Sequence, residues 1–184
     1  MPTTLMLYHG TTHDLGGIDI RRGKPYKDFG QGFYLTRIYE HARNIAIRNR
    51  SIELERLRVI GAKTDISIYV YVYEFEQSMM DGLKVKHFES ADHEWLKFVI
   101  ENRTSRNCRH DYDIVIGPTA NDDTRASIRA IMNMSNGSPL EDAALDLLLG
   151  MLKPSRLPEQ YFFGTDRATA LLKVKERRQI NERT

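Results

Sequence analysis

Hydrophobic and polar positions along the chain form short strand-like runs separated by amphipathic segments. The clearest run is 66–75, where apolar and aromatic residues occupy both faces, as in a central strand covered on both sides. Shorter apolar runs at 5–9, 33–36, 113–117 and 161–164 predict four further strands. They follow one another without a regular βαβ rhythm, which favours a mixed α+β domain over a doubly wound sheet.

A helical period of apolar positions predicts four helices. The first runs from 38 to about 58, where Ala42 and Ala46 fall on one stripe, and Gly61 ends it. A second over 91–103 takes Ser90 as its N-cap. An apolar helix covers 140–152, and Thr165 caps a last helix from 166 to about 178.

Composition limits the class of protein. A length of 184 residues favours one domain, and we expect a single domain over 1–184. Hydrophobic residues make up 41% and charged residues 28%, which excludes collagen-like and disordered chains. The single cysteine, Cys108, excludes an internal disulfide and a structural zinc site. The first residues lack the basic region and apolar run of a secretory signal, and the longest apolar stretches are about half a membrane span. We therefore expect a cytoplasmic protein without membrane contact.

Charge is unevenly spread although the net charge is only +2. Between residues 37 and 63, seven basic residues stand against three acidic ones, and the C-terminal segment is basic again. The middle of the chain is acidic. Such asymmetry is typical either of a polyanion-binding face or of solvated amphipathic helices.

Several common sites are absent from the sequence. It contains no phosphate-binding G-x-x-x-x-G-K and no G-x-G-x-x-G after a strand. The triplet 28–30 matches the magnesium-binding Asp-Phe-Gly of kinases, but the chain is too short for a kinase and lacks the other kinase motifs. No His or carboxylate pairs have metal-ligand spacing on a helix, so we expect no metal.

Three segments carry candidate chemistry. Tyr-His-Gly-Thr at 8–11 ends a strand, so a histidine is exposed beside bare glycine backbone. Asp-Phe-Gly-Gln-Gly-Phe-Tyr-Leu-Thr at 28–36 is a tight loop that leads into a strand. Glu-Gln-Tyr-Phe-Phe-Gly-Thr at 159–165 is a late strand that begins with two polar residues.

Taken in order, these segments resemble the ADP-ribosyltransferase superfamily, in its poly-ADP-ribose-polymerase-like or diphtheria-toxin-type branch. That branch has a His-Gly, then a Gly-x-Tyr, then a late glutamate. The chain looks closest to an uncharacterised bacterial family within it, which also shares a Tyr-Asp-Ile-Val-Ile-Gly-Pro strand, here 112–118. The resemblance implies a split pair of small antiparallel sheets flanked by helices, with NAD as co-substrate in a cleft between them.

The resemblance also implies the roles of individual residues. His9 would bind the adenosine ribose, Gly10 would offer its backbone to the nicotinamide amide, and Tyr34 would stack on the nicotinamide ring. The other residues assigned to NAD binding are Thr11, Gly32, Phe33 and Thr36. The reaction breaks the nicotinamide–ribose bond through an oxocarbenium-like state.

The sequence departs from the pattern at Gln160, where the commoner residue is glutamate. An amide can orient the ribose 2′-hydroxyl, but it carries no charge and takes no proton. Together with His9 and Tyr34, Gln160 would form the catalytic set and favour a single transfer of ADP-ribose. The general base is left open between Glu159, Asp122 and Asp123. Alternatively, Gln160 only satisfies backbone groups at the start of a strand.

The expected activity is therefore an NAD-dependent mono-ADP-ribosyltransferase. The alternative is a catalytically inactive module that binds NAD or another nucleotide. The acceptor is left open between a protein side chain and a small molecule, with weaker support for nucleic acid because no aromatic residues accompany the arginines of 43–58. Bacterial members of the superfamily are often toxins with a neutralising protein partner, and the arginine-rich helix would be a docking surface for such a partner.

Overall fold

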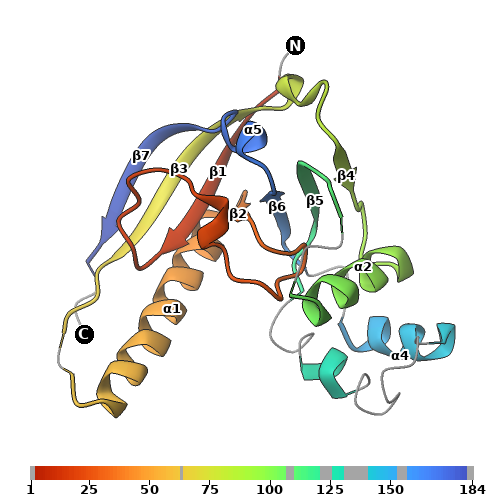
Figure 1. Ribbon diagram of the computed structural model, residues 1–184, viewed down its shortest axis with the longest axis horizontal. Coiled ribbons are helices and arrows are strands. Elements are labelled where there is room, and N and C mark those ends of the chain that lie inside the picture. The colour runs from red at the N-terminus through yellow and green to blue at the C-terminus, as the bar shows by residue number, and fades with distance from the viewer. Residues whose placement is uncertain are drawn as a thin grey trace. The chain divides into compact units, whose positions relative to one another are not determined.

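The computed structural model describes residues 3–62, 64–106, 110–120, 126–130, 141–152 and 157–181. The strands are β1 (Thr4–Thr11), β2 (Phe33–Thr36), β3 (Ile68–Glu76), β4 (Val85–His87), β5 (Ile114–Pro118), β6 (Glu159–Phe163) and β7 (Lys173–Ile180). They form one seven-stranded mixed sheet in the order β4-β5-β6-β2-β1-β3-β7 (Figure 1). The α+β class is confirmed. The predicted split pair of antiparallel sheets is wrong, because the strands join in one sheet in which β4 and β5 run parallel.

The chain divides into two compact units, and each is made of separate segments. The first contains Met1–Ile18, Tyr34–Gly82 and Arg167–Thr184, and the second contains Asp19–Phe33 and Leu83–Asp166. The prediction of one domain over 1–184 stays a prediction.

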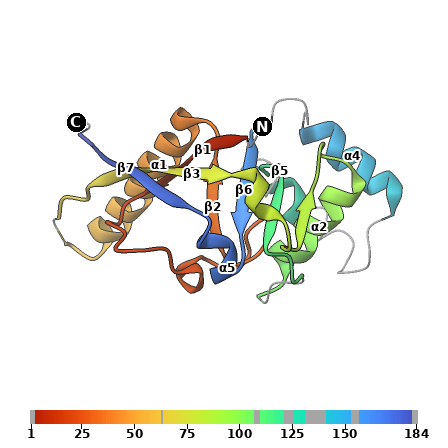
Figure 2. The same ribbon diagram turned by 90° about the horizontal axis from the view of Figure 1, so that it is seen from above.

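The first unit is built around β3. β1 pairs with β3 antiparallel over eight positions from Thr4↔Glu76 to Thr11↔Tyr69, and β7 pairs with its other edge. These three strands lie side by side in both views (Figure 2). Apolar residues on both faces of β3 are buried, from Ile68 to Phe75, as the sequence pattern predicted.

The helix α1 (Tyr39–Val59) begins and ends within one residue of its predicted bounds. Ala42 and Ala46 are its buried residues, because small side chains allow close packing on the strands. Gly61 has a φ of +73° and its N–H donates to the Arg58 carbonyl, while the N–H of Ala62 donates to the Leu57 carbonyl. This pair of bonds is a glycine-terminated helix end, as predicted.

The predicted C-terminal helix over 166–178 is wrong. The structure has one helical turn, α5 (Asp166–Thr169), followed by β7. Lys, Glu and Arg in this segment are good helix formers, but the open edge of β3 offers backbone partners over seven register positions, from Ile68↔Ile180 to Glu74↔Lys173. Tertiary pairing therefore overrides local propensity.

The second unit has a core rich in aromatic side chains. Phe29, Trp95 and Phe162 are completely buried, and the Trp95 indole N–H donates to the Pro118 carbonyl at 3.0 Å. The longer helices of this unit are α2 (His93–Thr104) and α4 (Asp142–Leu152), and residues 126–130 and Ile20–Arg22 are also helical in the part of the chain described. Ser90 is not the N-cap of α2, because the Asp92 side chain accepts from the Trp95 N–H at 2.9 Å. Within the described ranges, no helix has the length and apolar character needed to cross a membrane.

Candidate functional site

His9 and Tyr34 meet in the first unit, where β1 and β2 pair at Tyr8↔Thr36. The Nδ1–H of His9 donates a hydrogen bond of 2.8 Å to the Tyr34 carbonyl. A carbonyl oxygen only accepts, so the proton lies on Nδ1 and the orientation of the imidazole is fixed. Both side chains are half-buried. The fold therefore joins the first motif to the second.

Gly10 is required by the packing of α1. A Cβ added to Gly10 would lie 1.8 Å from the carbonyl oxygen of Ala42 and 3.2 Å from the Cβ of Ala46. Only glycine lets β1 and α1 approach this closely. This structural reason stands beside the predicted contact between Gly10 and nicotinamide, which stays a prediction.

Thr11 and Thr36 are buried and serve local turns. The Thr11 hydroxyl accepts from the backbone N–H of His13 at 3.1 Å, and the Thr36 hydroxyl accepts from the N–H of Ile38 at 3.3 Å, just before α1. Such bonds order the chain as it leaves each strand. The predicted contacts of both residues with NAD are not addressed by these bonds.

Tyr71 lies opposite His9 in the β1–β3 register and carries a polar network that the sequence did not reveal. Its hydroxyl donates to Asp14 at 2.5 Å and accepts from the Leu15 N–H at 2.6 Å, and Arg177 donates to the same Asp14 carboxylate at 2.5 Å. Burial raises the pKa of the Tyr71 hydroxyl, and the bond to Asp14 adds to this shift. The network fastens the segment after β1 to β3 and β7.

In the second unit, Gly32 and Phe33 follow a loop whose two sides are joined by hydrogen bonds of Gln31. The Gln31 side-chain amide donates to the carbonyls of Arg21 at 2.7 Å and Gly23 at 2.8 Å. A Cβ on Gly32 would lie 2.3 Å from a ring carbon of Phe162, so glycine is needed for packing here. Phe33 is buried. These contacts shape the loop, and the assignment of both residues to NAD binding stays a prediction.

Gln160 lies on β6 opposite Gly117 and is only 8% exposed. Its side-chain Nε2 donates to Oδ2 of Asp28 at 2.7 Å and to the carbonyl of Pro118 at 3.2 Å. The two N–H groups of the amide thus both have acceptors inside the second unit.

Asp28 is the centre of this polar cluster. Its Oδ1 accepts from Nε of Arg103 at 2.6 Å, and Nη2 of Arg103 forms an ion pair with the same oxygen. Its Oδ2 accepts from the N–H of Ala120 at 2.9 Å as well as from Gln160. The carboxylate therefore joins α2, the segment after β5 and the start of β6.

Glu159, one of the three candidate bases, has a different side-chain partner from the adjacent Gln160. Its carboxylate lies 3.7 Å from Nε2 of His87 and lines a hollow of about 450 Å³. The other lining residues are Phe88, Glu89, Ser90, Ala91, Pro118 and Leu157. Asp122 and Asp123 lie outside the described residues. Within the described ranges, no group of three or more His, Cys, Asp or Glu side chains is placed to hold a metal ion.

Comparison with known proteins places the chain in a family. A family model described as "Protein of unknown function (DUF3990)" matches residues 5–174. The chain belongs to this family. The matched range contains all the candidate site residues. No curated protein and no solved structure matches the chain.

Within this DUF3990 chain, the predicted site residues fall into two groups. His9, Gly10, Thr11, Tyr34 and Thr36 lie in the first unit, whereas Gly32, Phe33 and Gln160 lie in the second. Sequence reasoning missed Asp28 as a partner of Gln160. The only sign of its importance in the sequence was its place as the first residue of the second motif. A contact between residues 132 positions apart leaves no local pattern that could predict it.

Proposed function

We propose that this chain is an NAD-dependent mono-ADP-ribosyltransferase. The observation that carries the proposal is the 2.8 Å hydrogen bond from His9 to the Tyr34 carbonyl. It holds the His-Gly of the first motif beside the Gly-x-Tyr of the second, as the resemblance to that superfamily requires.

In the proposed reaction, the bond between nicotinamide and the ribose C1′ breaks, and nicotinamide leaves with the bonding electron pair. His9 binds the adenosine ribose, and Tyr34 stacks on the nicotinamide ring. The amide oxygen of Gln160 orients the ribose hydroxyls while positive charge develops on the ribose. The acceptor nucleophile then bonds to C1′ and releases its proton.

The test uses labelled NAD with the purified protein and a bacterial lysate. We expect label transfer by the unaltered chain and its loss in His9→Ala and Tyr34→Ala. Tyr26→Ala is the matched control at an exposed position and should transfer label normally. Transfer that survives in both site variants would contradict this assignment.

A second candidate is a module that binds NAD without turning it over. The observation that favours it is the burial of Gln160, whose amide nitrogen is fully used by Asp28 and Pro118. In that case NAD binds measurably by calorimetry, with neither label transfer nor release of nicotinamide. The same preparation therefore separates the two candidates.

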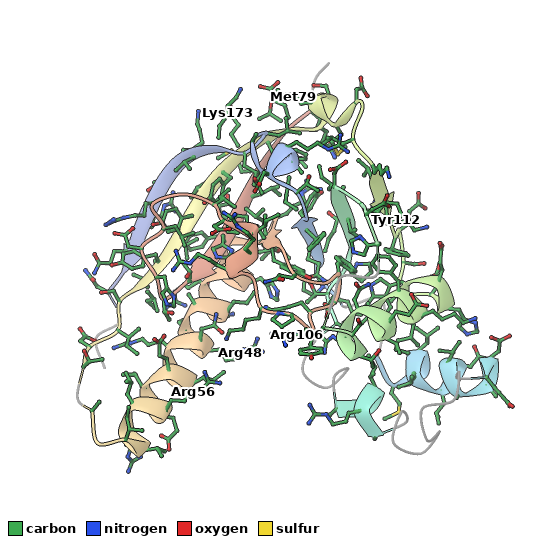
Figure 3. All side chains as sticks on the ribbon, viewed as in Figure 1. Arg48, Arg56, Met79, Arg106, Tyr112 and Lys173 are labelled. Carbon is green, nitrogen blue, oxygen red and sulfur yellow. The ribbon has the colours of Figure 1, made fainter. Side chains whose placement is uncertain are left out.

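We also propose that α1 is the docking surface for a neutralising protein partner or a protein acceptor, as in a toxin. Arg48 and Arg56 are exposed on this helix (Figure 3). Ile52, Val59 and Ile60 are exposed apolar residues of the same helix and its end. A basic surface with apolar residues suits an acidic protein surface.

A further inference from the structure

We infer that Asp28 is the positioning residue of Gln160: it holds the amide so that the side-chain oxygen, and not the nitrogen, is available to the ribose. The inference rests on the proposed function. It adds a role for a residue that the three motifs leave without one.

The orientation of the amide follows from its two neighbours. Oδ2 of Asp28 and the carbonyl oxygen of Pro118 lie 2.7 Å and 3.2 Å from Nε2 of Gln160, and both are acceptors. A flipped amide would place its oxygen against a carboxylate and a carbonyl, and both N–H bonds would be lost. Because Gln160 is only 8% exposed, water does not compensate this loss. Nε2 therefore stays inside and Oε1 is held away from Asp28.

The carboxylate can hold Gln160 because it is itself fixed. Arg103 approaches from α2 and the Ala120 N–H approaches from the segment after β5. The side chains of Asp28 and Arg103 are 6% and 10% exposed, so water screens the pair little. Because α2 and the segment after β5 both hold the Asp28 carboxylate, it gives the Gln160 amide, at the start of β6, a fixed position.

The same geometry explains why position 160 carries an amide where the commoner pattern has glutamate. A carboxylate at this position would face Asp28 and the carbonyl of Pro118 with no proton to donate. Two carboxylates at hydrogen-bonding distance cannot both ionise without a large cost, so one would have to bind a proton. Asp28 and Gln160 thus form a matched pair of acceptor and donor.

The experiment compares four proteins: the unaltered chain, Asp28→Asn, Gln160→Glu, and the double variant that exchanges amide and carboxylate. Thermal unfolding is followed at about pH 4.5 and about pH 8, on either side of the range in which a raised carboxyl pKa would lie. Relative to the unaltered chain, we expect Gln160→Glu to lose stability as pH rises, because its added carboxyl must then ionise beside Asp28. The double variant keeps one carboxylate and one amide, and should lose most of this extra pH dependence.

Steady-state NAD turnover is the second readout. In Asp28→Asn, the Arg103 guanidinium favours the oxygen of the new amide, so its nitrogen faces Gln160 and draws the Gln160 oxygen inward. We expect kcat to fall roughly 10- to 100-fold, with the KM for NAD changed less than about threefold, because a reacting group is misplaced without loss of the binding contacts. Asp111→Asn, at an exposed aspartate of the same unit, is the matched control and should be unchanged.

The outcomes separate this inference from the proposed function. Unchanged kcat in a folded Asp28→Asn variant overturns the positioning role and leaves the transferase proposal standing. No turnover by the unaltered chain overturns the transferase proposal, and the unfolding arm then decides whether residues 28 and 160 are coupled. If Asp28→Asn does not fold, Gln160→Glu alone decides: pH dependence equal to that of the unaltered chain overturns the inference.

Discussion

Arg103 and Asp28 form an ion pair whose side chains are 10% and 6% exposed, and Arg103 also donates to the Ala120 carbonyl at 2.9 Å. Breaking such a pair leaves a buried charge without its counter-charge. Arg103→Gln should therefore lower the free energy of unfolding by about 3–5 kcal/mol, measured by urea denaturation. Arg106→Gln removes an exposed arginine nearby and should change it by less than about 0.5 kcal/mol. Equal effects would show that the pair contributes no special stability.

Stability should fall as pH decreases below about 6.5 because of His110. This imidazole stacks on Phe98 with 4.8 Å between ring centroids and donates to the Phe29 carbonyl. Burial lowers the pKa of His110, so the unfolded chain binds a proton more readily than the folded chain does. Stability from this group is therefore present at neutral pH and lost progressively in acid.

His110→Gln retains a donor for the Phe29 carbonyl and removes the titrating group. Its unfolding temperature should depend less steeply on pH between about 5 and 7 than that of the unaltered chain. His13→Gln, at an exposed position, controls for the loss of a histidine. Identical slopes in the unaltered chain and His110→Gln would contradict the prediction.

Gly10→Ala should destabilise the first unit because its Cβ would lie 1.8 Å from the carbonyl oxygen of Ala42. Either α1 or β1 must move, and overpacking of this kind costs about 1–3 kcal/mol or more. Gly16→Ala is the matched control, since no described residue other than its chain neighbours comes within 4 Å of its added Cβ. Urea denaturation of both variants makes the comparison. Similar losses would mean that glycine flexibility, and not the close approach of α1, determines the effect.

Asp92→Ala should cost about 1 kcal/mol, because its side chain caps α2 by accepting from the Trp95 N–H. Ser90→Ala tests the position that local sequence favoured as the cap and should have little effect. Thermal unfolding of the two variants, followed by circular dichroism, distinguishes them. A larger loss of stability in Ser90→Ala than in Asp92→Ala would show that Ser90 caps α2, as the sequence predicted.

Charge reversal on α1 should weaken engagement of an acidic partner or acceptor. Arg48→Glu with Arg56→Glu changes two exposed positions, and Lys173→Glu reverses an exposed charge on β7 as a control (Figure 3). We expect less label transfer to protein acceptors with unchanged NAD binding, because rim charges mainly affect association. If transfer is equal in all three proteins, α1 is only solvated surface.

Much of the fold could be predicted where local chemistry decides it. The bounds of β2 were predicted correctly at Phe33–Thr36, and α1 ends just before Gly61, where a positive φ suits glycine. The buried character of β3 was visible because its apolar residues occupy both faces. Propensity misled at the C-terminus, where β7 forms because β3 offers a free edge.

The candidate site was predicted only in part, for the same physical reason. The sequence by itself singled out the candidate side chains, with His9 at the end of one predicted strand and Tyr34 within another. Strand register decided that the imidazole meets the Tyr34 carbonyl. Burial decided that Gln160 needs acceptors for its amide, and only the tertiary structure showed that Asp28, held by Arg103, supplies one. Local pattern records propensity and exposure, whereas the partner of a buried polar group depends on which distant elements pack together.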